Sequence, residues 1–118
     1  MISLTKAEEE VMQILWELDE AFVKEIIEKF PKSKPAYNTI STVIRILEKK
    51  GIVAHKAFGR THQYYALLSK EEYRKQTAEN LLNKYFSGSM EKMVSFFVKE
   101  KKMSMKELEE IINKIDKL

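Results

Sequence analysis

The sequence AYNTISTVIRILEKKGIVAHKAFGRTHQYYAL at residues 36–67 carries the clearest structural signals in the chain. Its first half repeats apolar residues at helical spacing, which predicts a helix from about Ala36 to Lys50. Gly51 suits the position that follows a helix. The second half holds two stretches rich in β-branched and aromatic residues, 52–58 and 62–67. Because the tripeptide Gly-Arg-Thr lies between them, these stretches predict a β-hairpin.

Two helices are predicted before this stretch. Thr5 and Glu8 have the spacing of a capping box, and apolar residues then recur at helical spacing from about Lys6 to Leu18. Apolar residues between positions 23 and 30 predict a short second helix. It ends before the chain's two prolines, each of which removes a backbone donor and disfavours helix in the preceding residue.

Three more helices are predicted after the hairpin. A second capping box, Ser69 to Glu72, begins the first of them, and Ser87-Gly88 ends it. Apolar residues mark the next helix between positions 90 and 98. A third capping box, Ser104 to Glu107, begins the last helix.

The order of these elements indicates the fold class. Three helices followed by a hairpin is the order of a winged helix-turn-helix, in which the hairpin is the wing and the third helix contacts DNA. We therefore expect a mainly α protein with a small β-hairpin. Residues 1–69 would form the winged helix and residues 70–118 a helical dimerisation region.

Composition excludes several classes of protein. The chain has 118 residues and no Cys, so it has no disulfide framework, thiolate metal site or cysteine nucleophile. No apolar run is long enough to span a membrane, and the N-terminus lacks a secretion signal, so we expect a soluble, cytoplasmic protein. Two histidines make a poor metal site, and no nucleophile has an obvious base partner. We expect no enzyme activity, no cofactor and no metal.

Charge is distributed unevenly along the chain. The formal net charge is −5 over residues 1–30, +6 over residues 31–67 and +2 over residues 68–118. A local positive field favours contact with nucleic acid, although a solvated basic surface is common. The acidic run Glu8-Glu9-Glu10 is expected to be a solvated first helical turn, because consecutive helical residues point in different directions.

The third predicted helix has two faces when each residue is advanced by about 100°. Ile40, Val43, Ile44 and Leu47 share the core face. The opposite face contains no carboxylate, and its Asn, Ser, Thr and Arg side chains can bond to base edges in a major groove. The residues predicted to contact DNA bases are Asn38, Ser41, Thr42 and Arg45, and Thr39 is also predicted to bind DNA. Those predicted to contact phosphates are Lys49, Lys50, Arg60 and His62, of which the last two belong to the hairpin.

The C-terminal helices contain three apolar stripes that a segment of about 50 residues can hardly bury alone. A core shared with a second copy of the chain is the economical solution. The residues predicted to form this dimer contact are Leu81, Tyr85, Met93, Phe97, Leu108, Ile111 and Ile115. Two alternatives stay open: a regulator whose Met- and Phe-rich C-terminal helices bind an apolar effector, and a winged helix that binds another protein.

Three segments carry a resemblance to a known family: LTKAEEEVMQILWEL (4–18), NTISTVIRILEKKGIV (38–53) and GRTHQYYAL (59–67). Together they resemble the BlaI/MecI type of penicillinase repressor over nearly the whole chain. The resemblance implies a homodimeric repressor bound to a two-fold symmetric operator near β-lactamase or related resistance genes. It also implies that a membrane metalloprotease receptor triggers proteolysis within the dimerisation region.

Carried over by position, the cleaved bond lies between Phe96 and Phe97. The best-known family members have Asn before Phe at this bond, whereas this chain has Phe96. The copper-responsive branch of the family has C-terminal Cys pairs, which this chain lacks. We therefore do not expect metal sensing.

Overall fold

The structure is a computed structural model that describes residues 2–100 and 104–116, apart from the side chains at positions 112, 115 and 116. The chain divides into two compact units, Met1–Arg74 and Lys75–Leu118. The sequence predicted a boundary after residue 69. The division follows residue 74 instead, within a helix that begins at residue 70.

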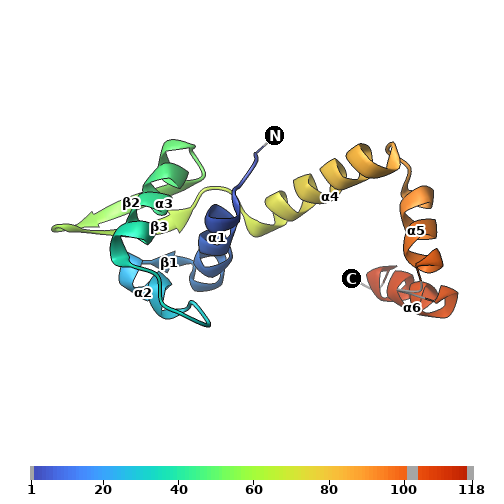
Figure 1. Cartoon of the computed structure of the whole chain (residues 1–118), viewed down its shortest axis with the longest axis horizontal. Coiled ribbons are helices and arrows are strands. Elements are labelled where there is room, and N and C mark those ends of the chain that lie inside the picture. The colour runs from blue at the N-terminus through green and yellow to red at the C-terminus, as the bar shows by residue number, and fades with distance from the viewer. Residues whose placement is uncertain (1, 101–103, 117–118) are drawn as a thin grey trace. The chain divides into compact units, whose positions relative to one another are not determined.

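The elements of the first unit are, in chain order, α1 (Lys6–Leu18), β1 (Glu20–Ala21), α2 (Val23–Glu28), α3 (Tyr37–Lys49), β2 (Val53–Phe58) and β3 (Thr61–Ala66) (Figure 1). Helix α4 (Lys70–Phe86) begins in the first unit and continues into the second. The second unit also contains α5 (Met90–Lys99) and α6 (Met105–Asp116). The predicted winged-helix order is confirmed.

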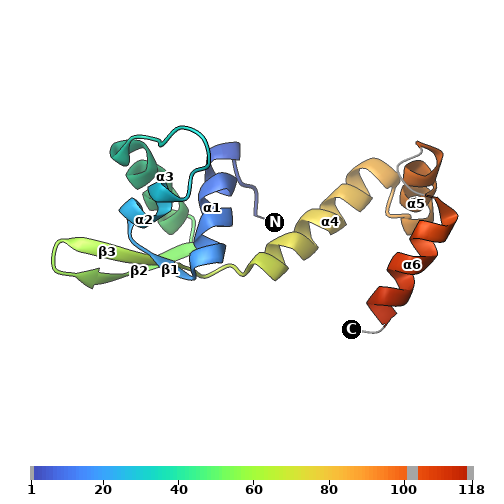
Figure 2. The same cartoon turned by 90° about the horizontal axis from the view of Figure 1, so that it is seen from below.

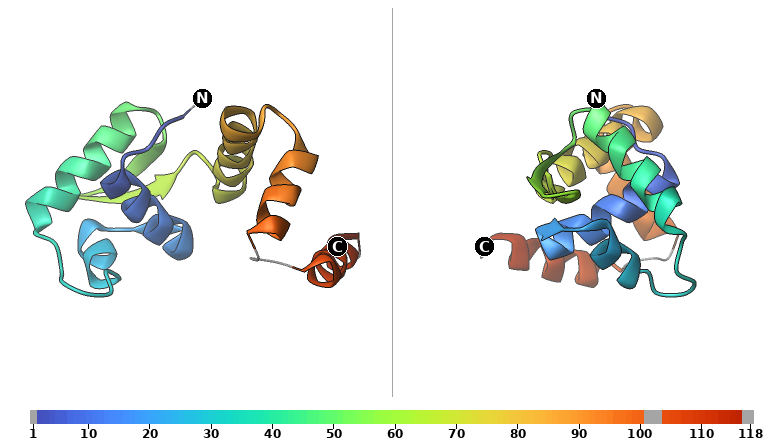
Figure 3. Two further views of the ribbon diagram at one scale, coloured as in Figure 1. Left: turned by 45° about the vertical axis from the view of Figure 1, so that its right-hand side comes forward. Right: turned by 90° about the vertical axis from the view of Figure 1, so that its left-hand side faces the viewer.

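Helices α1, α2 and α3 pack against one another and lie side by side in both views of Figure 3. The core between them consists of the apolar stripe of each helix, completed by side chains from the strands. Its buried members are Val11, Met12, Ile14, Leu15, Ala21, Val23, Ile26, Ile40, Ile44, Leu47, Ile52, Val53 and Tyr64. Because α3 is held on its apolar side, its polar side is available at the surface.

The sheet has three antiparallel strands in the order β1-β3-β2, one more than the predicted hairpin. The added strand β1 pairs Glu20 with Tyr65 and Ala21 with Tyr64. Strands β2 and β3 pair from Val53↔Ala66 to Phe58↔Thr61 and project as a hairpin beyond the helices of this unit (Figure 2). This hairpin is called the wing below.

The capping box at the start of α1 is confirmed. The Thr5 hydroxyl accepts from the amide of Glu8, whose carboxylate accepts from the amide of Thr5. The expectation of a fully solvated first turn is wrong for Glu8, which is only 4% exposed. Its carboxylate lies 2.8 Å from the ammonium of Lys50 at the end of α3. This ion pair joins the first turn of α1 to the end of α3.

The segment that follows β3 is held against α1 by contacts of Trp16. The indole nitrogen of Trp16 donates to the carbonyl of Leu68 over 2.8 Å, and its ring lies 5.6 Å from that of Tyr73 in the first turn of α4. The Ser69 hydroxyl accepts from the amide of Glu72, as its predicted capping role requires. The first unit therefore includes the start of α4.

The second unit has little core of its own among its described residues. Neither α4 nor α5 contains a buried side chain. Of the residues predicted to form the dimer contact, Leu81, Tyr85, Phe97 and Ile111 are exposed, and Met93 and Leu108 are half-buried. The side chain of Ile115 lies outside the described residues.

No helix within the described residues has the length and hydropathy needed to cross a membrane.

Candidate nucleic-acid interface

Helix α3 presents a polar face opposite its buried apolar face. Ile40, Ile44 and Leu47 are buried against the core, in agreement with the periodicity of the sequence. The residues predicted to contact DNA from this helix lie on the other side: Asn38, Thr39, Thr42, Arg45 and Lys49 are exposed, and Ser41 is half-buried. The structure therefore brings these six side chains to one accessible surface.

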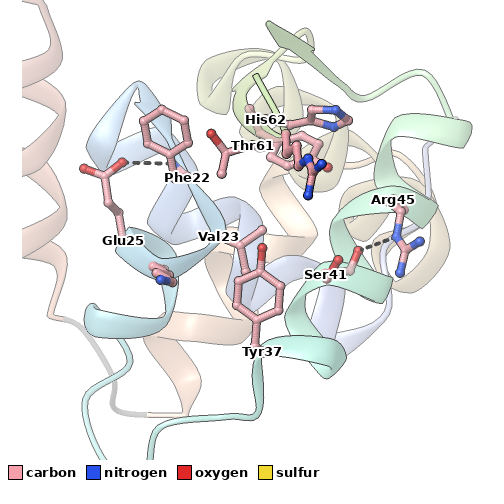
Figure 4. A pocket seen from close by; sticks show the side chains of 11 residues that line it. Phe22, Val23, Glu25, Tyr37, Ser41, Arg45, Thr61 and His62 are labelled. Carbon is pink, nitrogen blue, oxygen red and sulfur yellow. Dashed lines mark hydrogen bonds between the residues drawn. The ribbon is translucent and has the colours of Figure 1, made fainter. Parts of the chain in front are cut away.

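Two of these side chains are oriented by the backbone of α3 itself. The Thr42 hydroxyl donates to the Asn38 carbonyl over 2.8 Å. Nε of Arg45 donates to the Ser41 carbonyl over 3.2 Å, drawn as a dashed line in Figure 4. Each bond reaches one turn back along the helix, so it restrains the side chain along the exposed surface.

The wing places Arg60 and His62 at or beside its turn, and both side chains are exposed. Gly59 has a φ of +62°, a conformation that L side chains rarely adopt, and the Thr61 hydroxyl donates to the Phe58 carbonyl over 2.9 Å. The ring of Phe58 meets the edge of Phe22, at the start of α2, with 5.9 Å between centroids. The turn is thus tight, and an aromatic contact supports it.

A cleft of about 560 Å³ lies between the start of α2, the exposed face of α3 and the wing. Ser41, Arg45, Thr61 and His62 border it in Figure 4, with Tyr37 at the first turn of α3. The full lining is Phe22, Val23, Lys24, Glu25, Tyr37, Ser41, Arg45, Arg60, Thr61, His62 and Tyr64. The cleft thus gathers predicted DNA-contacting residues from α3 and from the wing.

Lys24 and Tyr37 line the cleft with a cation and a hydroxyl, and neither was among the predicted site residues. Tyr37 is 49% exposed and lies one helical turn before Ser41. The helical periodicity could have found Tyr37, because a step of about 100° back from Asn38 places it beside Ser41. Lys24 belongs to another helix, and no local pattern in the sequence relates it to α3.

The two histidines lie together on the wing. The rings of His55 and His62 stack with 3.9 Å between centroids and 6° between planes. Nδ1 of His55 bonds to the carboxylate of Glu48 on α3. Since a carboxylate only accepts, Nδ1 carries the proton. Tyr64 makes edge contacts with both rings. The pKa of Tyr64 is raised, mainly by burial and in second place by the nearby Glu48 carboxylate.

Lys50, a predicted phosphate contact, is bound to Glu8 within the first unit. Burial alone raises the pKa of Glu8, but the hydrogen bonds and charge of Lys50 and the bonds from Thr5 outweigh it and lower the pKa overall. The ammonium of Lys50 thus already has an anionic partner. Lys49 next to it is exposed.

No group of three or more potential metal-ligating side chains comes together within the described part of the chain. The chemistry that the surface offers is recognition, because hydroxyl and guanidinium groups line the cleft and its cations come from α2, α3 and the wing. A winged helix with this surface defines a class, the DNA-binding transcriptional regulators.

Comparison with known proteins agrees with this class. A family model described as penicillinase repressor matches residues 4–117. The chain is 34% identical over 115 residues to the methicillin resistance regulatory protein MecI of Staphylococcus aureus strain N315, covering 97% of this chain and 94% of MecI. It is 31% identical over 120 residues to the penicillinase repressor of Staphylococcus aureus, covering 98% and 95% of the two chains.

A solved structure gives the same result. The solution structure of the DNA-binding domain of the repressor BlaI matches with a TM-score of 0.53 and 30% identity, covering 60% of this chain and 88% of that domain. The chain belongs to the penicillinase repressor family, whose members are DNA-binding transcriptional repressors and not enzymes.

Proposed function

We propose that this repressor acts as a homodimer bound to a two-fold symmetric DNA operator. The observation that carries the proposal is the polar face of α3, which contains no carboxylate and borders the same cleft as the wing. Its residues are Asn38, Ser41, Thr42, Arg45 and Lys49. Solvent-exposed helix faces usually mix both signs of charge, whereas a face that meets phosphates excludes acids.

Helix α3 enters the major groove in this proposal, with Asn38, Thr39, Ser41, Thr42 and Arg45 toward base edges. Lys49, Arg60 and His62 contact phosphates. The sugar–phosphate strand between a major groove and the adjacent minor groove lies in the cleft between α3 and the wing, where Lys24 and the Tyr37 hydroxyl add a cation and a donor. Lys50 is left out of this set because it is paired with Glu8.

The dimer contact is proposed to involve α4, α5 and α6. Support comes from the lack of buried side chains in α4 and α5 and from the exposed Leu81, Tyr85, Phe97 and Ile111. Exposed apolar surface of this extent is typical of a face that a partner covers. A second copy would also place two reading helices at a fixed separation, as a two-fold operator requires.

The test compares Arg45→Ala with Lys49→Ala on an operator identified by footprinting DNA that flanks the protein's own gene. Arg45→Ala should weaken specific binding by about 1–3 kcal/mol and relax the base preference at one position of each half-site. Lys49→Ala should weaken binding to all sequences alike and make the salt dependence shallower. Unchanged affinity and base preference in Arg45→Ala would contradict the assignment of this face.

The regulated genes are proposed to be resistance genes, as the names of the relatives imply, and a membrane sensor metalloprotease is proposed to end repression by cleavage between Phe96 and Phe97. Both residues lie within α5, and the ring of Phe96 packs 5.6 Å from Phe86. A protease needs an extended strand, so α5 has to open locally before it is cut. Mass spectrometry of the repressor from induced cells tests this step; an intact chain during full derepression contradicts it.

A second candidate is control by a small apolar effector. A groove of about 410 Å³ in the second unit is lined by Met90, Val94, Val98 and Met105, together with Glu91, Ser95 and Lys99. Loss of operator binding on addition of an effector, with the chain intact, would support this candidate over cleavage. Replacing Val94 with a larger Phe should then weaken the response to the effector.

A further inference from the structure

Helix α3 carries one acidic residue, Glu48, in its last turn. A carboxylate close to DNA phosphates is repelled by them, so an acid on a DNA-contacting helix weakens binding unless it has another task. Glu48 is half-buried, and its carboxylate bonds to Nδ1 of His55 on β2. The one acidic residue of α3 is therefore bonded to the wing.

The contact continues from His55 to the surface of the cleft. His62, one strand over on β3, stacks flat on His55 with 3.9 Å between ring centroids. The edge of Tyr64 supports both rings, at 5.7 Å from His55 and 6.1 Å from His62. Tyr64 itself is a buried member of the core. A carboxylate, two stacked rings and a core tyrosine thus connect the end of α3 to the cleft.

We infer that Glu48 and His55 are positioning residues for DNA binding: through the stacked ring of His55, Glu48 holds His62 and the wing at a fixed place relative to α3. This inference rests on the proposed function. The bond fixes the proton on Nδ1 of His55 and the plane of its ring, and the ring in turn supports one face of His62. Neither Glu48 nor His55 needs to touch DNA.

The physical advantage is preorganisation. The turn of the wing lies far along a two-stranded hairpin, and its side chains Phe58 and Arg60 are exposed. The contact of Phe58 with Phe22 ties the turn to the start of α2, but it does not fix the distance from the wing to α3. Without a link to α3, that distance would be restricted only when DNA binds, and the loss of freedom would reduce affinity. With the link, the two DNA-contacting elements keep their spacing before DNA arrives.

The positioning role of Glu48 and its negative charge predict opposite changes in DNA affinity when Glu48 is replaced. Glu48→Met removes one negative charge beside the proposed DNA surface, which by electrostatics tightens binding, and it also removes the acceptor of the His55 bond, which Gln would keep. If Glu48 positions the wing, this substitution weakens binding instead. Glu25→Gln is the control for loss of charge alone, because Glu25 borders the cleft but accepts its 2.8 Å bond from the amide of Phe22, directly before α2.

The experiment measures dissociation constants of the full chain for its footprinted operator duplex by gel mobility shift. Glu48→Met and His55→Phe should each weaken binding by about three- to tenfold, and Glu25→Gln should tighten it. His62→Gln should weaken binding as well, and adding Glu48→Met to it should produce a smaller loss than Glu48→Met produces alone, since part of the effect of Glu48 passes through His62. Nuclear magnetic resonance of the free protein should show greater mobility of the β2–β3 backbone in Glu48→Met.

Different outcomes separate this inference from the proposed function. Tighter binding by Glu48→Met, or an effect that adds fully to that of His62→Gln, overturns the positioning role while DNA binding stands. Absence of salt-dependent binding by the unmodified chain overturns both. Should Glu48→Met fail to fold, His55→Phe retains the ring stack without the Nδ1 donor, and unchanged affinity in that variant overturns the inference on its own.

Discussion

At the scale of single residues, the ion pair between Glu8 and Lys50 makes stability depend on pH. Lys50 and Thr5 lower the pKa of Glu8 below its ordinary value of 4.5 despite its burial. A group whose pKa is lowered by folding stabilises the folded state above its unfolded pKa, and this contribution disappears as the pH falls through the folded pKa. The pair therefore stabilises the first unit at neutral pH and ceases to do so in acid.

Lys50→Met should lower the free energy of unfolding at pH 7 by about 1–2 kcal/mol, because it leaves a buried carboxylate without its cation. The difference from the unmodified chain should shrink as the pH falls below the ordinary value of 4.5 and then through the lowered pKa of Glu8 in the folded chain. Urea unfolding followed by circular dichroism measures both quantities. Lys29→Met is the control: its 3.6 Å contact with Glu17 is exposed on both sides, so a change within about 0.5 kcal/mol is expected.

The same residues mark what sequence could and could not predict about the site. Periodicity separated the exposed polar residues of α3 from Ile40, Ile44 and Leu47, because the spacing within one helix is local information. The partners of Lys50 and His55 were not predicted. Glu8 is 42 positions from Lys50, and only the packing of α1 on α3 brings their charges together.

At the scale of elements, Gly51 determines how α3 passes into β2. Its φ is +80°, and a Cβ added there would meet nothing within 4 Å. Gly51→Ala should therefore reduce stability through the backbone alone, by about 1–2 kcal/mol, and Gly51→Asn by less, since Asn tolerates this conformation better. Thermal unfolding by calorimetry checks the order Gly, Asn, Ala. Equal stabilities of the Ala and Gly proteins would contradict it.

Element boundaries were predicted well where a cap or a glycine marked them. The range of α1 agrees with the prediction, and Thr5 and Glu8 form the expected capping box. Strand β1 was missed because two residues are too short for any periodic pattern, and its identity depends on pairing with Tyr64 and Tyr65 of β3. Such a strand exists only once the rest of the sheet is present.

At the scale of the whole molecule, the two units differ in how far each can fold alone. The first unit has a core drawn from all its helices and from its strands, whereas α4 and α5 have no buried side chain. A fragment of residues 1–74 should therefore be a folded monomer. It should bind the operator far more weakly than the full chain, because two winged-helix units are no longer joined in one dimer. Sedimentation equilibrium of fragment and full chain measures both states. A full chain that is monomeric at micromolar concentration would contradict the proposed dimer.

The hydrogen bond from Trp16 to Leu68 makes the fluorescence of Trp16 a reporter of this part of the structure. Trp16 is the sole tryptophan, its N–H donates to a backbone carbonyl just before α4, and Tyr73 lies close enough to transfer excitation to it. Its emission therefore comes from one place, the exit of the chain from the winged helix. A shift of that emission to longer wavelength would report that α4 has detached from α1, in unlabelled protein and in real time, whether the cause is DNA, a protease or heat.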